Sequence, residues 1–120
     1  MKLEEEVKKY MQNKNKSMIT ANTYQIEAKK TAIFPANKAL EYLSLGLVGE
    51  AGEVANKIKK IIRDKKIDVD VASEIGDVLW YCAMLADYLN VDLGRVMENN
   101  LDKLRSRKER GVLGGSGDKR

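Results

Sequence analysis

Residues 46–60 read GLVGEAGEVANKIKK and residues 73–86 read SEIGDVLWYCAMLA, and these two stretches are the most informative about the fold. Around the first, Leu43, Leu47 and Val54 belong to a series of apolar residues spaced by three, four or seven positions. The apolar residues of the second stretch recur at similar spacings. This is the period of an amphipathic helix, so each stretch predicts a helix with one buried face.

Similar helical patterns lie on both sides of these stretches. The predicted helices cover about 2–12, 20–33, 38–63, 71–89 and 93–110, and QNKNK (12–16) is a predicted linker. Pro35 separates the second helix from the third, because proline disfavours helix at the residue before it. Side chains able to cap a helix N-terminus precede the later segments, namely Thr20 or Asn22, Asn37, Asp70 and Asp92. The chain is therefore predicted to be all-α, a small bundle of four to five helices.

The composition suits one soluble globular domain. The chain has 120 residues, of which 43% are apolar and 33% are charged. It has no histidine, which excludes a Ser-His-Asp triad and histidine-ligated zinc, and its single cysteine excludes an internal disulfide. The N-terminus lacks the apolar segment of a secretory signal, and no apolar run is long enough to span a membrane. We therefore expect a cytoplasmic protein without a membrane partner.

Acidic residues interrupt the apolar faces of the two central helices. Glu50 stands between two apolar positions of its stripe, and Glu53 lies one turn further along the same face. Glu74 and Asp77 repeat this arrangement on the next helix. Two adjacent helices are thus predicted to carry an acidic pair each, set among apolar neighbours.

Such carboxylates need a partner, because burying an uncompensated one costs on the order of several kcal/mol. A multivalent cation between the two pairs would remove their repulsion, and oxygen ligands without Cys or His favour Mg²⁺, Mn²⁺ or Ca²⁺. Ordinary surface ion pairs with lysines such as Lys57 and Lys59 are the alternative. The recurrence of the acidic pair on two core stripes favours a metal site.

Glycines accompany both acidic pairs inside the predicted helices. Gly46, Gly49 and Gly52 surround the first pair, and Gly76 lies within the second. Each costs roughly 1 kcal/mol relative to alanine in a helix interior. We interpret them as allowing close approach of helices or room for a ligand, with loose packing or a helix end near residue 46 as the alternative.

Together with their flanking residues, the acidic pairs resemble the MazG-like all-α nucleoside triphosphate pyrophosphohydrolase superfamily. The family pattern is ExxE followed by ExxD, here Glu50-x-x-Glu53 and Glu74-x-x-Asp77, and the resemblance runs from about Tyr24 to the C-terminus. It implies that these four carboxylates hold Mg²⁺, with Mn²⁺ as a substitute. It also implies hydrolysis of an NTP or dNTP to the monophosphate and pyrophosphate. The attacking group would be a metal-activated water at the α-phosphorus, with Glu53 or Glu50 as general base.

The resemblance further implies contacts to the substrate. The candidates for the sugar and phosphates are Tyr81, Lys57, Asn100, Lys103 and Arg107. The candidates for holding the base are Gln25, Phe34 and Lys60. Each cation has an ordinary alternative as a solvated surface charge, and each aromatic residue as a core anchor.

Three segments are distinguished in the chain: an N-terminal extension (1–18), the pyrophosphohydrolase-like domain (19–110) and a glycine-rich tail (111–120). The tail is interpreted either as a disordered terminus or as a backbone nest that closes on phosphates. Wide apolar helix faces favour burial between copies, and the resemblance implies a homodimer or tetramer. A non-catalytic regulatory protein that binds nucleotide or nucleic acid is the alternative function. Nucleic acid is the less favoured partner, since the inward carboxylates would repel it.

Overall fold

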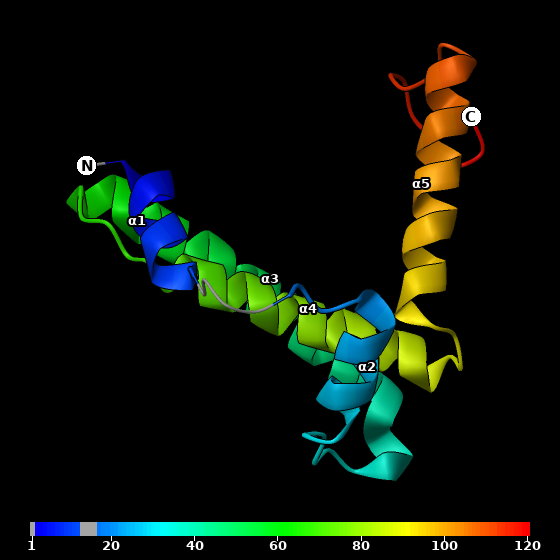
Figure 1. Ribbon diagram of the computed structural model, residues 1–120, viewed down its shortest axis with the longest axis horizontal. Coiled ribbons are helices and arrows are strands. Elements are labelled where there is room, and N and C mark those ends of the chain that lie inside the picture. The colour runs from blue at the N-terminus through cyan, green and yellow to red at the C-terminus, as the bar shows by residue number, and fades with distance from the viewer. Residues whose placement is uncertain (1, 13–16) are drawn as a thin grey trace.

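A computed structural model describes residues 2–12 and 17–120, and within them every regular element is a helix. The elements are α1 (Leu3–Met11), α2 (Ala21–Lys29), the 3-10 helix η1 (Ala36–Lys38), α3 (Ala39–Asp64), α4 (Val71–Tyr88) and α5 (Leu93–Glu109). The all-α prediction is confirmed, and each predicted helix has an observed counterpart (Figure 1). Most of the predicted linker falls on residues 13–16, outside the described residues.

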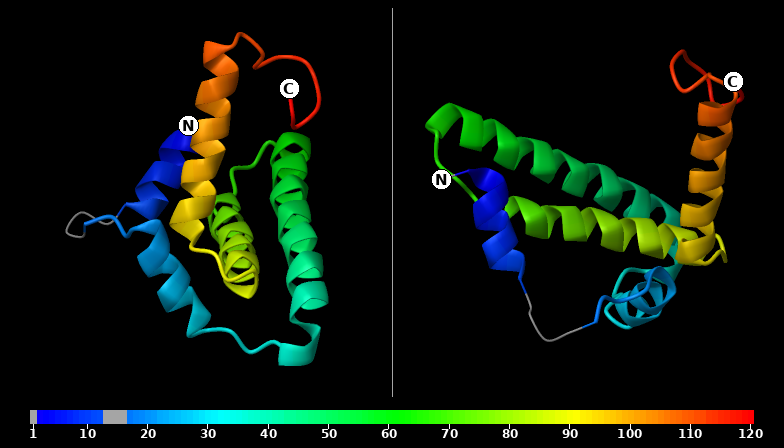
Figure 2. Two further views of the ribbon diagram at one scale, coloured as in Figure 1. Left: turned by 90° about the vertical axis from the view of Figure 1, so that its right-hand side faces the viewer. Right: turned by 45° about the horizontal axis from the view of Figure 1, so that its top comes forward.

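The long helices α3 and α4 form a hairpin that is the body of the molecule (Figures 1 and 2). Lys65, in a left-handed conformation at φ 52°, ends α3 and opens the polar turn to α4. Leu43 of α3 and Met84 of α4 are the largest fully buried side chains. Ala28 and Leu93 join them in the core, which therefore lies where α2 crosses the hairpin and α5 begins.

The predicted helix caps hold only in part. Thr20 caps α2, because its Oγ1 accepts a hydrogen bond from the backbone N–H of Thr23 at 3.2 Å. The prediction for Asn37 is wrong, since this residue lies inside η1. Asp70 and Asp92 precede their helices without any capping side-chain bond. Asp70 already has helical dihedral angles, φ −64° and ψ −13°, instead of the extended backbone typical of a capping residue.

Side chains of α2 cap α5 in place of Asp92. The backbone N–H of Leu93 donates to Gln25 Oε1 at 2.9 Å, and that of Gly94 donates to Asn22 Oδ1 at 2.8 Å. These two amides belong to the first turn of α5, where a helix has no internal partners for them. The direction in which α5 leaves the hairpin is therefore set by α2.

Much apolar surface stays uncovered in one copy of the chain. Beyond its first turn α5 projects away from the hairpin (Figures 1 and 2), and Met97 and Leu101 on it are 52% and 42% exposed. On α4, Ile75 and Leu79 are each 51% exposed. None of the described helices is long and apolar enough to cross a membrane.

Candidate active site

Three carboxylates meet in the middle of the hairpin. Glu50 of α3 and the pair Glu74 and Asp77 of α4 each offer an oxygen atom, and these atoms all lie within 4.8 Å of one another. Glu50 and Glu74 are half-buried, whereas Asp77 is exposed. The i, i+3 spacing on α4 presents both of its acidic side chains to the same side, where they face Glu50 across the helix interface. We call these three residues the acidic cluster.

The fourth predicted ligand, Glu53, lies outside the acidic cluster. It is exposed at the surface of α3, one turn beyond Glu50. Residues three apart on a helix point in directions about 60° apart, so the two side chains need not reach the same point. The structure thus brings three of the four predicted ligands together and leaves Glu53 beside them.

Repulsion within the acidic cluster acts most clearly on Glu74. Its pKa lies above the ordinary glutamate value, mainly because of desolvation and then because of the adjacent carboxylates of Glu50 and Asp77. Lys57 opposes this shift, with its ammonium 3.9 Å from Glu74 Oε1 and 3.6 Å from Asp68 Oδ2. The predicted phosphate contact Lys57 is therefore engaged with carboxylates here. One ammonium shared in this way leaves the cluster with net negative charge.

The raised pKa of Glu74 predicts how binding of a divalent cation to the acidic cluster would depend on pH. Protons and the metal compete for the same oxygen atoms, so affinity falls when this carboxyl takes up a proton. Because the pKa is raised, protonation begins at a higher pH than for an ordinary glutamate. With Mg²⁺ as the probe ion, any affinity measured by calorimetric titration should begin to weaken at a higher pH than an ordinary glutamate ligand would give. Affinity that stays constant until the ordinary glutamate range is reached would contradict this expectation.

A pocket of about 310 Å³ opens beside the acidic cluster. It is lined by Thr31, Glu50, Asp77, Trp80 and Tyr81. The pocket is thus lined by two carboxylates, two aromatic rings and the hydroxyl of Thr31. Such a pocket suits a ligand with a charged part and a flat apolar part.

The aromatic wall of this pocket belongs to a larger group of rings. Phe34 stacks on Tyr42 with ring centroids 5.6 Å apart and meets Trp80 edge-on at 6.5 Å. Tyr81 meets Trp80 edge-on at 5.0 Å. Trp80 Nε1 donates to Thr31 Oγ1 at 2.9 Å, which fixes the indole. Of the predicted residues, Tyr81 therefore lines the pocket beside the acidic cluster, and Phe34 belongs to the same aromatic group through Trp80.

Three residues of this pocket region were missed by sequence reasoning. Trp80 follows Asp77 by three positions, so helical spacing alone could have placed it beside the acidic pair. Tyr42 and Thr31 come from segments outside the acidic motifs. Their positions depend on how α2 and the start of α3 pack on α4, and no local pattern reports that packing.

One glycine explains how Tyr81 fits against α3. A Cβ at Gly46 would lie 2.1 Å from Cε1 of the Tyr81 ring, so the ring occupies the space that a side chain would fill. At Gly49, Gly52 and Gly76 a Cβ would meet no atom within 4 Å. The interpretation as close approach therefore holds for Gly46, and the other three leave open space. A helix end near residue 46 is excluded, since α3 continues to Asp64.

The structure corrects the interpretation of Gln25 as a base contact. Its side chain is buried at 7% exposure between α2, α4 and the start of α5. Nε2 donates to the carbonyls of Ala83 and Val91 at 3.1 and 3.0 Å, in addition to the bond that Oε1 accepts from Leu93. The amide holds three segments of the fold together, so we no longer assign it to a nucleotide base.

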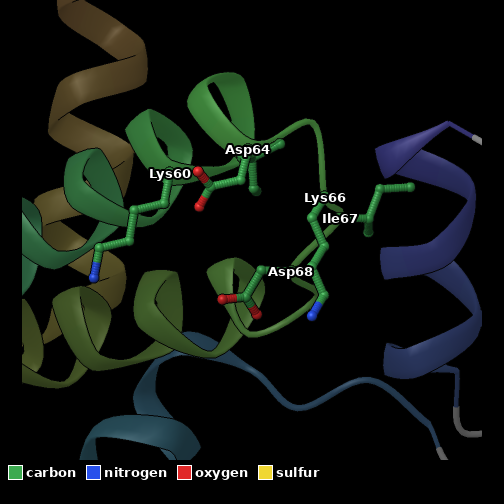
Figure 3. A pocket seen from close by; sticks show the side chains of 6 residues that line it. Lys60, Asp64, Lys66, Ile67 and Asp68 are labelled. Atoms are coloured by element: carbon green, nitrogen blue, oxygen red, sulfur yellow. The ribbon is translucent and has the colours of Figure 1, made fainter.

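Lys60 lies in a different pocket from the one at the acidic cluster. This second pocket, of about 360 Å³, is at the turn between α3 and α4, next to α1 (Figure 3). Its other lining residues are Ile61, Asp64, Lys66, Ile67 and Asp68. Lys60 therefore does not line the pocket beside the acidic cluster, and its role as a base contact stays a prediction.

The candidates on α5 do not form one open face. Asn100 and Lys103 line a shallow pocket on α5 with Val96 and Asn99, and the helix carries them away from the hairpin (Figure 2). Arg107 is buried at 5% exposure under the C-terminal tail. Within one copy, Asn100 and Lys103 are open to solvent, whereas Arg107 is covered.

Comparison with known proteins adds to this geometry. Residues 38–112 match the model of the MazG nucleotide pyrophosphohydrolase domain. The gene 37 protein of Mycobacterium phage L5 is 51% identical over 109 residues, covering 81% of this chain and 96% of that protein. No solved structure matches the chain. The matched domain segment contains α3, α4 and α5 and therefore both acidic pairs.

Proposed function

Because the chain belongs to the MazG nucleotide pyrophosphohydrolase family, we propose that it hydrolyses a nucleoside triphosphate, ribo or deoxyribo, to the monophosphate and pyrophosphate. The observation that carries this proposal is the position of the acidic cluster beside a pocket lined by Trp80 and Tyr81. A nucleotide combines the two parts that this site suits. Its triphosphate needs a cation in order to approach carboxylates, and its base is a flat ring that stacks on aromatic side chains.

The donor set of the acidic cluster fits Mg²⁺, with Mn²⁺ as a substitute. Glu50, Glu74 and Asp77 supply hard oxygen ligands without nitrogen or sulfur, close enough to share one ion. The raised pKa of Glu74 supports the fit, since it reflects negative charge that Lys57 does not fully offset. When bound, the cation would offset the charge of the triphosphate and lower the pKa of a bound water.

The surrounding side chains have separate tasks in this proposal. The water that attacks the α-phosphorus must lose a proton, and a carboxylate outside the acidic cluster is free to accept it. Glu53 meets this description, since it is exposed one turn from the cluster. Glu50, which belongs to the cluster, is the second candidate for the base. Once a cation offsets Glu74, Lys57 can turn from that carboxylate to a phosphate oxygen.

The test is a hydrolysis assay on each common NTP and dNTP, with Mg²⁺ and with EDTA, and with separation of pyrophosphate from phosphate. We expect metal-dependent release of pyrophosphate and monophosphate, and its loss in Glu53→Gln and Asp77→Asn. Glu41→Gln is the matched control, because Glu41 is an exposed glutamate of α3 paired with Lys38 at 3.6 Å. No turnover of any nucleotide by folded, metal-bound protein would contradict the proposal and favour a binding or regulatory role.

Tryptophan fluorescence should report binding to the pocket directly. Trp80 is the single tryptophan of the chain, and it lines the pocket with Glu50 and Asp77. We expect a nucleotide that stacks there to change the emission when Mg²⁺ is present and to leave it unchanged in EDTA. A change of equal size without metal would separate nucleotide binding from the acidic cluster and count against the proposed site.

We also propose that copies of the chain associate through their exposed apolar faces, as a dimer or tetramer. The apolar side chains of α4 and α5 that remain 39–52% exposed in one copy supply such a face, namely Ile75, Leu79, Val96, Met97, Leu101 and Leu104. Sedimentation equilibrium should give a multiple of 13.5 kDa. Leu101→Glu should shift the protein toward the monomer, whereas Asp102→Asn, a change at an exposed charged neighbour, should not. A monomer at every concentration would contradict the association.

A further inference from the structure

The pocket beside the acidic cluster presents hydrogen-bond acceptors to a ligand. The carboxylates of Glu50 and Asp77 line it, and an ionised carboxylate can only accept hydrogen bonds. The indole of Trp80 carries an N–H group, but this group already donates to Thr31 Oγ1 at 2.9 Å. Whether the pocket can also donate to a ligand therefore depends on its two hydroxyl groups, those of Thr31 and Tyr81.

The hydroxyl of Thr31 is fixed as an acceptor toward the pocket. A hydroxyl group has one donor and two acceptor positions. Thr31 Oγ1 donates its proton to the carbonyl of Ala28 at 2.7 Å and accepts the indole N–H of Trp80. One acceptor position is left, and the hydroxyl cannot donate elsewhere without breaking its bond to Ala28. A ligand group that reaches Thr31 must therefore bring the proton itself.

The hydroxyl of Tyr81 is engaged by a neighbouring tyrosine. Its pKa is raised first by burial and then by Tyr42, through charge and through a hydrogen bond. A hydrogen bond raises the pKa of a phenol when the neutral phenol donates it. Tyr42 is not among the residues that line the pocket, so the Tyr81 proton is used outside it. Each side-chain donor of the lining thus has an acceptor within the protein.

Such a lining distinguishes nucleobases by their exocyclic group. Cytosine and adenine carry an amino group, a donor, at the position where uracil, thymine and hypoxanthine carry a carbonyl oxygen, an acceptor. The amino group can donate to the open acceptor position of Thr31, whereas a carbonyl oxygen would meet a second acceptor with no proton between them. Both groups would then be left unpaired, and a pocket rejects a ligand most strongly in this situation.

We propose that Thr31 makes this pocket selective for nucleotides whose base carries an exocyclic amino group, at the position of cytosine N4 or adenine N6. The inference rests on the proposed function, since it places the base of the nucleotide in the pocket. It adds a substrate class that the family match does not supply, because Thr31 lies before the matched residues 38–112. Thr31 is thus a specificity-determining residue, and the acidic cluster and its metal have no part in the choice of base.

Two pairs of nucleotides isolate this choice. The pairs are dCTP with dUTP and ATP with ITP, whose members differ in the amino or carbonyl group and in the proton on the adjacent ring nitrogen. All four are used as α,β-imido analogues, which cannot be cleaved at the α-phosphorus, and calorimetric titration in Mg²⁺ gives each Kd. We expect the amino member of each pair to bind about tenfold more tightly or better, because its partner leaves an acceptor unpaired.

Substitutions at Thr31 test whether its hydroxyl makes the choice. Thr31→Val keeps the shape of the side chain, removes the acceptor and frees the indole N–H of Trp80, so the preference should vanish or turn toward the carbonyl member. Thr31→Ser keeps the hydroxyl and should keep the preference. Thr23→Val is the matched control, since Thr23 is an exposed threonine of α2 whose hydroxyl accepts a bond from Thr20 at 2.9 Å, and it should leave both Kd values unchanged.

Trp80→Phe separates selection by Thr31 from support of the indole ring. This change removes the N–H that bonds to Thr31 and keeps an aromatic side chain. Both members of a pair should bind more weakly by the same factor, and the ratio of their Kd values should stay as in the wild type. A ratio that is lost in Trp80→Phe but kept in Thr31→Val would assign the selection to the indole and overturn the role of Thr31.

The remaining outcomes separate this inference from the proposed function. Equal affinity within both pairs, or tighter binding of the carbonyl members, would overturn the selectivity even if every natural nucleotide is hydrolysed. A preference among the uncleavable analogues, without hydrolysis of natural dCTP or ATP, would leave the selectivity standing and remove the enzymatic activity. Absence of binding by all four analogues in Mg²⁺ would overturn the placement of a base in this pocket and the selectivity with it.

Discussion

Glu74→Gln should abolish nucleotide hydrolysis and at the same time make the metal-free protein more stable. Glu74 lies at the centre of the acidic cluster, with Glu50, Asp77 and Lys57 around it. Loss of even an outer partner of a metal ligand costs about 10–100-fold in affinity or activity. We therefore expect loss of a direct ligand to lower kcat/KM by about 100-fold or more, measured at saturating Mg²⁺.

The stability part of this prediction follows from the sign of the pKa shift. The folded state raises the pKa of Glu74, so it holds the charged form less favourably than the unfolded chain does. This glutamate therefore contributes less to stability as the pH rises above its ordinary range, and a neutral amide removes that penalty at neutral pH. In EDTA the melting temperature of Glu74→Gln should exceed that of the wild type.

The melting temperatures of the wild type and of Glu74→Gln also report on metal binding. Mg²⁺ should raise the melting temperature of the wild type, because a ligand that binds only the folded state stabilises it, and should have little effect on Glu74→Gln. Glu41→Gln, which changes an exposed glutamate of α3 outside the acidic cluster, should behave as the wild type in every measurement. A Glu74→Gln protein that melts lower in EDTA, or keeps its activity, would mean that the three carboxylates do not act as one charged cluster.

Gly46→Ala should destabilise the protein and disturb the aromatic pocket, whereas Gly49→Ala should do neither. A methyl group at position 46 meets the Tyr81 ring at 2.1 Å, so the ring or the helix must move. Overpacking of this kind costs about 1–3 kcal/mol. At Gly49 no atom lies within 4 Å of the added Cβ, and alanine is the better helix former by roughly 1 kcal/mol.

Urea unfolding in EDTA followed by Trp80 fluorescence measures both effects in one experiment. The free energy of unfolding should fall in Gly46→Ala and rise in Gly49→Ala, and native emission should change only in the former, since Trp80 contacts Tyr81 at a 5.0 Å centroid distance. Nucleotide binding should weaken in Gly46→Ala alone. Equal stability of the two variants would show that Tyr81 does not pack on α3 in solution.

The sequence predicted the helices well because their signal is local. Apolar spacing identified α3 and α4 to within one or two residues of the observed Ala39–Asp64 and Val71–Tyr88. The acidic pairs stand out as exceptions to the same apolar spacing, and this predicted a site that includes the three carboxylates that the structure brings together. Local periodicity could not tell whether Glu53 turns toward the others or toward solvent, since that choice depends on the rotation of the whole helix.

Features that depend on contacts between distant segments could not be predicted from the sequence. The residues around Gln25 in the sequence do not indicate whether its amide contacts a base or is buried. Its structural role follows only from its hydrogen bonds to Ala83, Val91 and Leu93. Asp92 fits the local sequence pattern of an N-cap residue, but side chains of α2 supply the capping groups instead. Arg107 shares a helix face with Lys103 by spacing, yet the tail covers one and not the other.

Because α2 holds only the first turn of α5, a small rotation there is amplified along the rest of the helix. The rotation would pivot about the hydrogen bonds from the backbone of Leu93 and Gly94 to the side chains of Gln25 and Asn22. The helix that moves has 17 residues. At 1.5 Å per residue the helix is about 25 Å long, so a tilt of about 10° at its first turn moves its far end by roughly 4 Å. A slight shift of α2 would therefore be magnified into a large displacement of the arginine-rich tip, while the carboxylates of the hairpin stayed in place.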